Sequence, residues 1–157
     1  MSSAAKVRRA SAQDRQRLLD LWLDLVEHHR HLDPRYPRLS GIREVLLGEI
    51  ARGLERSSCR IWLAELEGEP VGFLFAELEA ARPGESAAAW IHELYVARER
   101  RRRGIASILV DAADAWFVEV GPRRARVRVE PGNRPGLGFW SARGFVEKSR
   151  LLERENA

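Results

Sequence analysis

The sequence of 157 residues contains a single cysteine, Cys59, and no long hydrophobic run. One cysteine excludes an internal disulfide, and the polar start Met-Ser-Ser-Ala-Ala-Lys has no apolar segment of signal-peptide length. A membrane span needs roughly 18 consecutive apolar residues, which no part of the sequence approaches. We therefore expect one globular domain over residues 1–157, a cytoplasmic location and no membrane partner.

The charges of the chain nearly balance. The 27 basic residues, nearly all arginine, stand against 23 acidic ones and leave a net charge of +4. This balance argues against a nucleic-acid partner, which usually needs a dominant basic surface. The cluster at 98–103 suits a polyanionic ligand. The cluster at 123–128 alternates with Ala125, Val127 and Val129, which is typical of the solvent face of a half-buried strand.

Hydrophobic periodicity predicts alternating strands and helices. Strands are expected at 7–10, 60–66, 70–78, 91–96 and 125–129 and from Phe145 onward, and helices at 14–31, 42–54, 107–120 and 133–144. Glu67-Gly68-Glu69 fits the turn of a hairpin, and Ser11 to Asp14 fits a capping box. The expected order is β-α-α-β-β-β-α-β-α-β.

The stretch from Trp90 to Ala106 combines a strand, a basic turn and the start of a helix. Period-2 alternation places Glu93 and His92 on opposite faces of the strand, which is expected to end near Val96. The free backbone N–H groups of the helix should then lie near 103–107. Together with the helix dipole and the side chain of Arg101 or Arg102, they predict a site for a phosphate or pyrophosphate.

The spacing Arg101-x-x-Gly104-x-Ala106 resembles the acyl-CoA pyrophosphate loop of the GNAT N-acetyltransferase family, Gln/Arg-x-x-Gly-x-Gly/Ala. A second motif follows about thirty residues later. The stretch from Asn133 to Phe145, Asn-Arg-Pro-Gly-Leu-Gly-Phe-Trp-Ser-Ala-Arg-Gly-Phe, resembles the family pattern Asn-x-x-Ala-x-x-Phe-Tyr-x-x-x-Gly-Phe. Two ordered motifs at the family spacing are far more specific than either one alone.

The second motif departs from the family pattern at two positions. Gly136 stands where the family usually has alanine, and glycine costs roughly 1 kcal/mol of helix propensity. Trp140 stands where the family often has the tyrosine that protonates the departing thiolate. An indole N–H does not ionise near neutrality, so we expect Trp140 to pack against the cofactor rather than act as an acid.

The resemblance implies an α+β fold of three layers, in which about four helices flank a mixed, mostly antiparallel sheet of six to seven strands. It implies acetyl-CoA as co-substrate, with the pantetheine arm lying along an exposed strand edge and an N–H of that edge facing the acetyl carbonyl. The cofactor-binding residues it implies are Leu94, Tyr95, Val96, Arg101, Arg102, Arg103, Gly104, Ile105, Ala106, Ser107, Asn133, Phe139 and Trp140.

Two residues are candidates for catalysis. An alkylammonium with a pKa of about 10.4 must lose a proton before it can attack a thioester, and Glu93 is the expected base, acting through an ordered water. The alternative is that Glu93 forms an ion pair with a neighbouring arginine. A thiolate with a pKa near 8.5 needs little help to leave. Tyr36 or Tyr95 could supply the missing phenol, and we assign this role to Tyr36.

In this family the segment between the first two helices overhangs the acceptor site. Here it runs from Glu27 to Pro37, and Glu27, His31, Asp33 and Tyr36 are the expected substrate-binding residues. Its three histidines do not predict a metal site, because no cysteine or carboxylate spacing completes one. A charged helix end followed by an extended proline loop is the alternative reading of the same segment.

The resemblance implies an enzyme that transfers the acetyl group of acetyl-CoA to a primary amine of a small molecule by direct attack within a ternary complex. Two alternatives stay open. One is acetylation of a protein lysine or amino terminus, and the other is a non-catalytic sensor of acyl-CoA. The strand expected after Phe145 could also pair with a second copy, which leaves a homodimer open.

Overall fold

A computed structural model describes residues 4–156 of the chain. The elements follow the order β1 (Lys6–Arg9), a 3-10 turn (Ala12–Asp14), α1 (Arg15–Leu32), α2 (Ile42–Glu55), β2 (Cys59–Leu66), β3 (Glu69–Glu79), β4 (Ala88–Val96), a second 3-10 turn (Arg98–Arg100), α3 (Ile105–Val120), β5 (Arg124–Val127) and α4 (Arg134–Ala142). The expected α+β class is confirmed.

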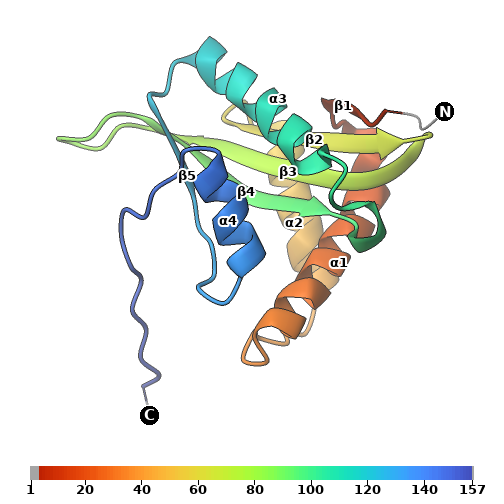
Figure 1. Cartoon of the computed structure of the whole chain (residues 1–157), viewed down its shortest axis with the longest axis horizontal. Helices are drawn as coiled ribbons and strands as arrows, with labels where there is room; N and C mark the ends of the chain where they lie inside the picture. The colour runs from red at the N-terminus through yellow and green to blue at the C-terminus, as the bar shows by residue number, and fades with distance from the viewer. Residues whose placement is uncertain (1–3, 157) are drawn as a thin grey trace.

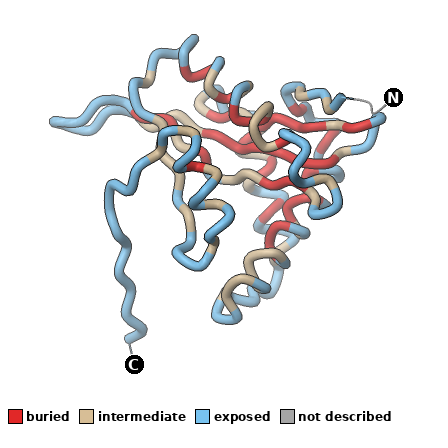
Figure 2. The backbone as a smooth tube through the Cα atoms, in the orientation of Figure 1, coloured by how far each residue is buried: buried red, intermediate tan, exposed pale blue. Residues whose placement is uncertain are grey.

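The strands form one mixed sheet in the order β1-β2-β3-β4-β5. The first four strands are antiparallel neighbours, and β5 joins β4 in parallel. The helices α1 and α2 cover one face of the sheet and α3 covers the other, which gives the expected three layers (Figure 1). The buried residues lie mainly along the strands and on the sheet-facing sides of these helices (Figure 2).

Each face of the sheet has its own apolar core. On one face, the ring of Trp22 in α1 lies 5.3 Å from that of Phe73 and 5.9 Å from that of Phe75 in β3. On the other face, Trp116 of α3 lies 5.6 Å from Trp62 of β2. Both helices carry apolar residues at the i, i+3, i+4 spacing that turns one side of a helix toward a sheet.

The expected strand after Phe145 is not formed. Residues 145–156 have no regular secondary structure, and they run away from the body of the molecule (Figure 1). A strand needs backbone partners, and no pairing partner for this segment lies among residues 4–156. The prediction of six to seven strands was therefore too high, since the described part of the chain contains five. The segment that was expected to pair with a second copy is irregular.

A β-bulge in β4 overturns the expected placement of His92. Phe75 of β3 pairs with Glu93, whereas Ala76 pairs with Ile91, so His92 is an extra residue without a partner of its own. Such an insertion resets the period-2 alternation. Glu93 shares the face of Phe75, and the His92 ring lies 5.5 Å from the Phe75 ring. Both side chains therefore face the α1 and α2 layer, and His92 does not point to the opposite face.

No helix within residues 4–156 combines the length and the apolar character that crossing a membrane requires.

Candidate active site

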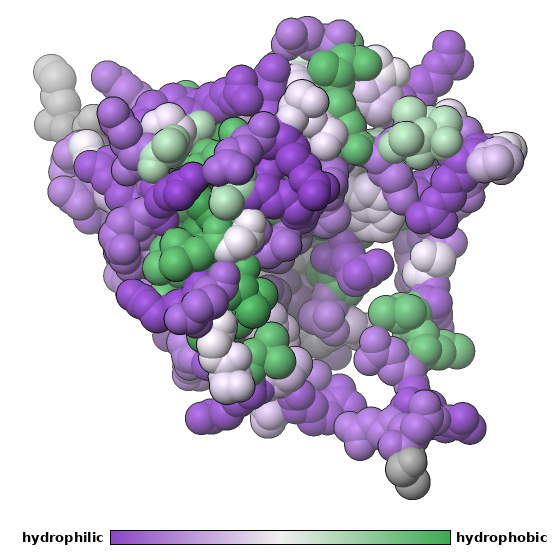
Figure 3. Space-filling view, turned by 180° about the vertical axis from the view of Figure 1, so that it is seen from behind, coloured by the Kyte–Doolittle hydropathy of each residue, from purple (hydrophilic) through white to green (hydrophobic). Residues whose placement is uncertain are grey.

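A cleft of about 1210 Å³ opens where β5 leaves the sheet. Its walls come from the end of α1, the loop that carries Tyr36, the second half of β4, the start of α3, the segment after β5, and α4. Seen from behind, the molecule is hollowed, and mostly hydrophilic residues surround the hollow (Figure 3). The cleft therefore brings together segments that lie more than one hundred residues apart in the sequence.

The start of α3 presents free backbone donors to this cleft. Gly104 precedes the helix with a φ of 74°, and its carbonyl accepts the first helical hydrogen bond, from the N–H of Ile108. The N–H groups of residues 105–107 therefore have no intrahelical acceptor. Arg102 also has a positive φ, of 59°, in the turn just before. This arrangement of N–H groups, with the positive end of the helix dipole, is suited to a phosphate group.

Arg101 connects this turn to the end of β4 through a hydrogen bond. Its Nε donates a hydrogen bond of 2.9 Å to the carbonyl of Val96, and its guanidinium lies 5.7 Å from the centroid of the Tyr95 ring. Arg101 and Arg102 both line the cleft, whereas Arg103 does not. The structure thus brings two of the three predicted arginines to the site.

The strands β4 and β5 diverge beside this turn. Their parallel pairing covers only Ala88–Ile91 of β4 and Arg124–Val127 of β5. Beyond Ile91, the edge of β4 that faces away from β3 has no strand partner within residues 4–156. Leu94, Tyr95 and Val96 of this segment line the cleft. Backbone groups of β4 are therefore available to an extended ligand that would lie along the strand like an added strand.

The helix α4 forms the wall opposite the start of α3. The Oδ1 atom of Asn133 accepts a hydrogen bond of 3.0 Å from the N–H of Gly136, which caps the helix as expected. The Trp140 ring lies 5.0 Å from the rings of both Phe139 and Phe145, in edge-to-face contacts. Asn133, Phe139 and Trp140 all line the cleft, as the second motif predicts.

Glu93 lies in the same cleft with its carboxylate largely withdrawn from water. Burial raises the pKa of Glu93 to about 7, and the charge of Glu49 in α2 adds to this shift. Within residues 4–156, no arginine or lysine is in ion-pair distance of this carboxylate. The structure therefore favours the acid–base interpretation of Glu93 over the ion-pair alternative.

Tyr36 lines the cleft from the loop after α1. Its ring stacks on His29, with centroids 5.3 Å apart and planes inclined by 16°. Burial raises the pKa of Tyr36, and the nearby charge of Glu93 adds to this shift. The charge of Glu93 therefore reaches Tyr36, and both residues line the same cleft.

The other predicted substrate residues do not line the cleft. Glu27 pairs with Arg30, and its carbonyl accepts a 2.7 Å contact from the ring Nδ1 of His31. Asp33 forms an ion pair of 3.0 Å with Arg35. The end of α1 instead presents His28 and His29, which were not among the predicted substrate-binding residues. Their proximity to the motif residues could not be inferred from spacing along the chain.

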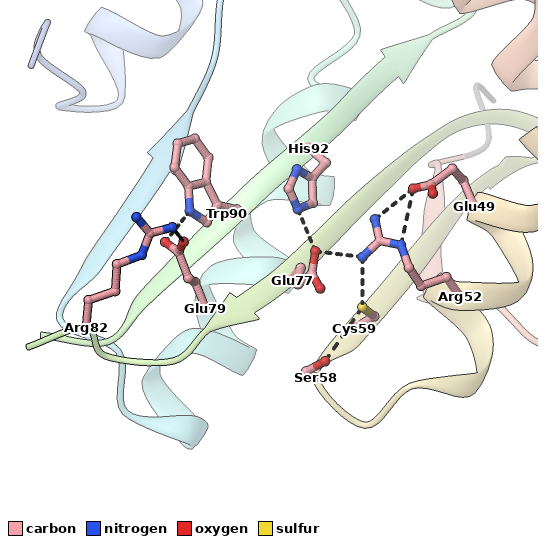
Figure 4. Close-up of polar contacts among 9 residues, drawn as sticks. All are labelled: Glu49, Arg52, Ser58, Cys59, Glu77, Glu79, Arg82, Trp90 and His92. Carbon is pink, nitrogen blue, oxygen red and sulfur yellow. Dashed lines mark hydrogen bonds and ion pairs between the residues drawn. The ribbon is translucent and has the colours of Figure 1, made fainter. Parts of the chain in front are cut away.

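A polar network on β3 and β4 was also missed. Glu77 forms an ion pair of 2.7 Å with Arg52 of α2, and its carboxylate lies 2.9 Å from the Nε2 of His92 (Figure 4). Glu79 accepts a hydrogen bond of 2.8 Å from the indole of Trp90 (Figure 4). The signal available in the sequence was the pair Glu77 and Glu79 at the end of an otherwise apolar strand. Within residues 4–156, no group of three or more His, Cys, Asp or Glu side chains is placed to hold a metal ion.

Comparison with known families agrees with this geometry. A sequence model described as "Acetyltransferase (GNAT) family" matches residues 19–145. The chain belongs to the GNAT acetyltransferase family. It is also 28% identical over 96 residues to an uncharacterized N-acetyltransferase of Methanocaldococcus jannaschii. That match covers 60% of this chain but only 42% of the length of the archaeal protein.

Solved structures share the fold of this GNAT chain. The aminoglycoside N-acetyltransferase AAC(6')-Iy in complex with CoA superposes with a TM-score of 0.78 at 19% identity, covering 99% of this chain and 97% of that one. A protein of Bacillus halodurans gives a TM-score of 0.85 at 15% identity, covering 97% and 99%. An aminoglycoside acetyltransferase from an uncultured soil metagenomic sample, in complex with sisomicin, gives 0.72 at 18% identity, covering 98% and 95%.

Proposed function

We propose that this GNAT protein is an acetyl-CoA-dependent N-acetyltransferase that acetylates a primary amine of a small molecule by direct attack in a ternary complex. The observation that carries the proposal is the continuity of the cleft, which runs from the start of α3, along the free edge of β4, to Glu93. Similar structures hold CoA or an aminoglycoside, which supports a small amine as acceptor.

The residues of the cleft fit the parts of acetyl-CoA. The free N–H groups of residues 105–107 and the side chain of Arg102 would bind the pyrophosphate. The unpaired edge of β4 around Leu94 and Val96 would bind the pantetheine arm. Asn133, Phe139 and Trp140 would form the opposite wall. Acetyl-CoA supplies a thioester, and an N–H of β4 would stabilise the negative charge that develops on its carbonyl oxygen.

Glu93 would accept the proton of the acceptor amine. An alkylammonium has a pKa of about 10.4 and cannot attack until it is deprotonated. A carboxylate whose pKa is about 7 is about half ionised at neutral pH and is a much stronger base than an exposed glutamate. The proton would pass from the amine to the Glu93 carboxylate directly or through one water.

Tyr36 would donate a proton to the departing thiolate. Its hydroxyl stays protonated well above neutral pH, because burial and Glu93 both raise its pKa. Trp140 occupies the position of the tyrosine that the family often uses, and its indole cannot supply a proton. Because a thiolate leaves readily, we expect the contribution of Tyr36 to be smaller than that of Glu93.

The proposal is tested by titration calorimetry with acetyl-CoA, paired with a thiol-release assay over polyamines, amino acids, aminoglycosides and short peptides. Binding together with release for a small amine would support the proposal. Release with peptides alone would instead indicate a protein acetyltransferase. Binding without release for any acceptor would favour a sensor, and absence of binding would overturn the assignment of the α3 site.

A further inference from the structure

The face of the sheet that looks toward α1 carries a row of polar side chains at the floor of the cleft. Trp90 of β4 pairs with Arg126 of β5, so these two residues share that face. Arg128 lies two residues further along and has the same orientation, whereas Val127 and Val129 pack into the core on the α3 side. The basic cluster at 123–128 therefore does not only face solvent, since Arg128 lines the cleft.

The two carboxylates at one end of this row already have cationic partners. Glu77 is paired with Arg52 at 2.7 Å and contacts His92. Glu79 is paired with Arg82 at 3.0 Å and with Arg126 at 3.3 Å (Figure 4 shows Arg82). Their negative charge is compensated within the protein. Neither is free to attract a second ammonium group of a substrate.

Arg128 has no such compensation. Its guanidinium lies 5.8 Å from the centroid of the Trp90 ring, and within residues 4–156 it makes no hydrogen bond or ion pair. Among the described residues, the guanidinium contacts this ring and no acceptor, which leaves its N–H groups available to an anion. Arg128 is thus a cation of the cleft without an anionic partner, on the same face of the sheet as the Glu93 carboxylate. Within residues 4–156, the carboxylate of Glu130, which also lines the cleft, makes no ion pair either.

Arg128 and Glu93 line the same cleft and face the α1 layer from neighbouring strands. The parallel register of these strands ends with Ile91 opposite Val127, and the strands diverge beyond this pair. An acceptor that contacts both groups must therefore span the gap between the strands, so its length matters. Glu130, two residues beyond Arg128, lines the cleft nearer to Tyr36 and His29, on whose pKa values its charge acts.

We propose that the acceptor is an amino acid or a similar amine that carries a carboxylate, with the carboxylate bound by Arg128 and the amine directed toward Glu93. This inference rests on the proposed N-acetyltransferase activity. A guanidinium binds a carboxylate through two parallel hydrogen bonds, and the indole of Trp90 holds it in place. An acceptor with only cationic groups would place one of them against Arg128, which disfavours such acceptors.

The test compares amines that differ only in a carboxylate. Thiol release is measured with α-, β- and longer ω-amino acids and with the alkylamines of matching length, in the wild-type protein, Arg128→Gln and Arg128→Lys. Arg123→Gln, at an exposed position outside the cleft, is the matched control. We expect the wild type to prefer at least one carboxylated amine over its matched alkylamine by at least ~10-fold in kcat/KM. Arg128→Gln should reduce this ratio toward one, mainly through KM, and Arg128→Lys should retain part of it.

Two outcomes separate failure of this inference from failure of the proposed function. If alkylamines or polyamines react as fast as the carboxylated amines, the proposed N-acetyltransferase activity is supported and the inference about Arg128 is overturned. If no amine causes thiol release, the inference is tested by calorimetry instead. Each carboxylated amine and its matched alkylamine are titrated into the protein loaded with acetyl-CoA. Tighter binding of the carboxylated amine, lost in Arg128→Gln, would support the inference. Equal binding of the two amines, or no binding of either, would overturn it.

Discussion

His92 and Glu93 are consecutive in β4, yet the β-bulge turns both side chains toward the α1 and α2 layer. Glu93 pairs with Phe75, and the His92 ring packs 5.5 Å from the same phenylalanine while its Nε2 contacts Glu77. Trp90, two residues before His92, faces the same layer, so it is Glu93 whose side chain the extra residue brings to this face. The bulge therefore places an imidazole ring next to the proposed base. His92 is also the first residue of β4 beyond the part that pairs with β5.

Replacing Glu93 by Gln should reduce turnover while leaving the affinity for acetyl-CoA nearly unchanged. Removal of a general base typically lowers the rate by ~10²-fold or more. In the wild type, kcat/KM should rise as the pH increases through about 7, since Glu93 must be ionised to accept a proton. Steady-state thiol release between pH 6 and 9 measures both effects. Glu69→Gln, at an exposed position at the start of β3, is the control. Unchanged turnover in Glu93→Gln across this range would remove Glu93 as the base.

The same carboxylate should make the free energy of unfolding depend on pH. The pKa of Glu93 is raised from 4.5 to about 7 in the folded protein, so the folded state binds the proton more tightly than the unfolded state. The stability that this proton binding confers is fully present below pH 4.5 and is lost as the pH rises through 7. Glu93→Gln should therefore be more stable than the wild type at pH 8, by up to ~3 kcal/mol, and similar to it at pH 4.5. Urea unfolding at both pH values measures the difference, and an equal effect at the two values would contradict the buried state of this carboxyl.

The element order and the two cofactor motifs could be predicted from the sequence because each depends on local pattern. Apolar periodicity specified α1 and α3, and the glycine at 104 together with the following helix indicated the free N–H groups. These features need only neighbouring residues. The family resemblance implied how these elements are arranged, and from that arrangement Glu93, Arg101 and Trp140 could be predicted to share one site. All three line the cleft.

The remaining features depend on contacts between distant segments. The bulge arises from the register between β3 and β4, which alternation within β4 alone does not encode. The stretch after Phe145 begins with Phe-Val, which suggested a strand, but it is irregular because it pairs with no strand edge within residues 4–156. The role of Arg128 depends on where β5 ends relative to Trp90. Likewise, Glu27 and Asp33 form ion pairs with nearby arginines and do not line the cleft, which their spacing in the sequence does not reveal.

The turn before α3 should tolerate substitution poorly. Gly104 has a φ of 74°, where a side chain costs roughly 1–2 kcal/mol, and a change of its backbone would rotate the N–H groups of residues 105–107. Gly104→Ala should therefore weaken acetyl-CoA binding by ~10-fold or more. Gly121→Ala is a matched control, because Gly121 has a φ of 92° at the other end of the same helix and lies outside the cleft. Calorimetry should show weaker binding in Gly104→Ala alone, and thermal unfolding should show a similar loss of stability in both. Equal affinity in the two variants would contradict the assignment of this turn to the pyrophosphate.

Two ion pairs anchor α4 to α3. Arg143 at the end of α4 forms ion pairs with Asp111 at 2.6 Å and with Asp114 at 3.3 Å, both on α3. The helix itself is short and contains Pro135, Gly136 and Gly138, so its own propensity is low and its position depends on such contacts.

Arg143→Ala should cost at most ~1 kcal/mol of global stability, because both aspartates are largely exposed to water. It should weaken acetyl-CoA binding more clearly, by ~3- to 10-fold, since the wall formed by Phe139 and Trp140 would no longer be held against α3. Arg150→Ala removes an ion pair with Glu147 in the exposed segment after α4 and should change neither property. Denaturant unfolding and calorimetric titration of the three proteins separate the two effects. If affinity falls only in proportion to stability, α4 contributes to folding but not to the shape of the cofactor wall.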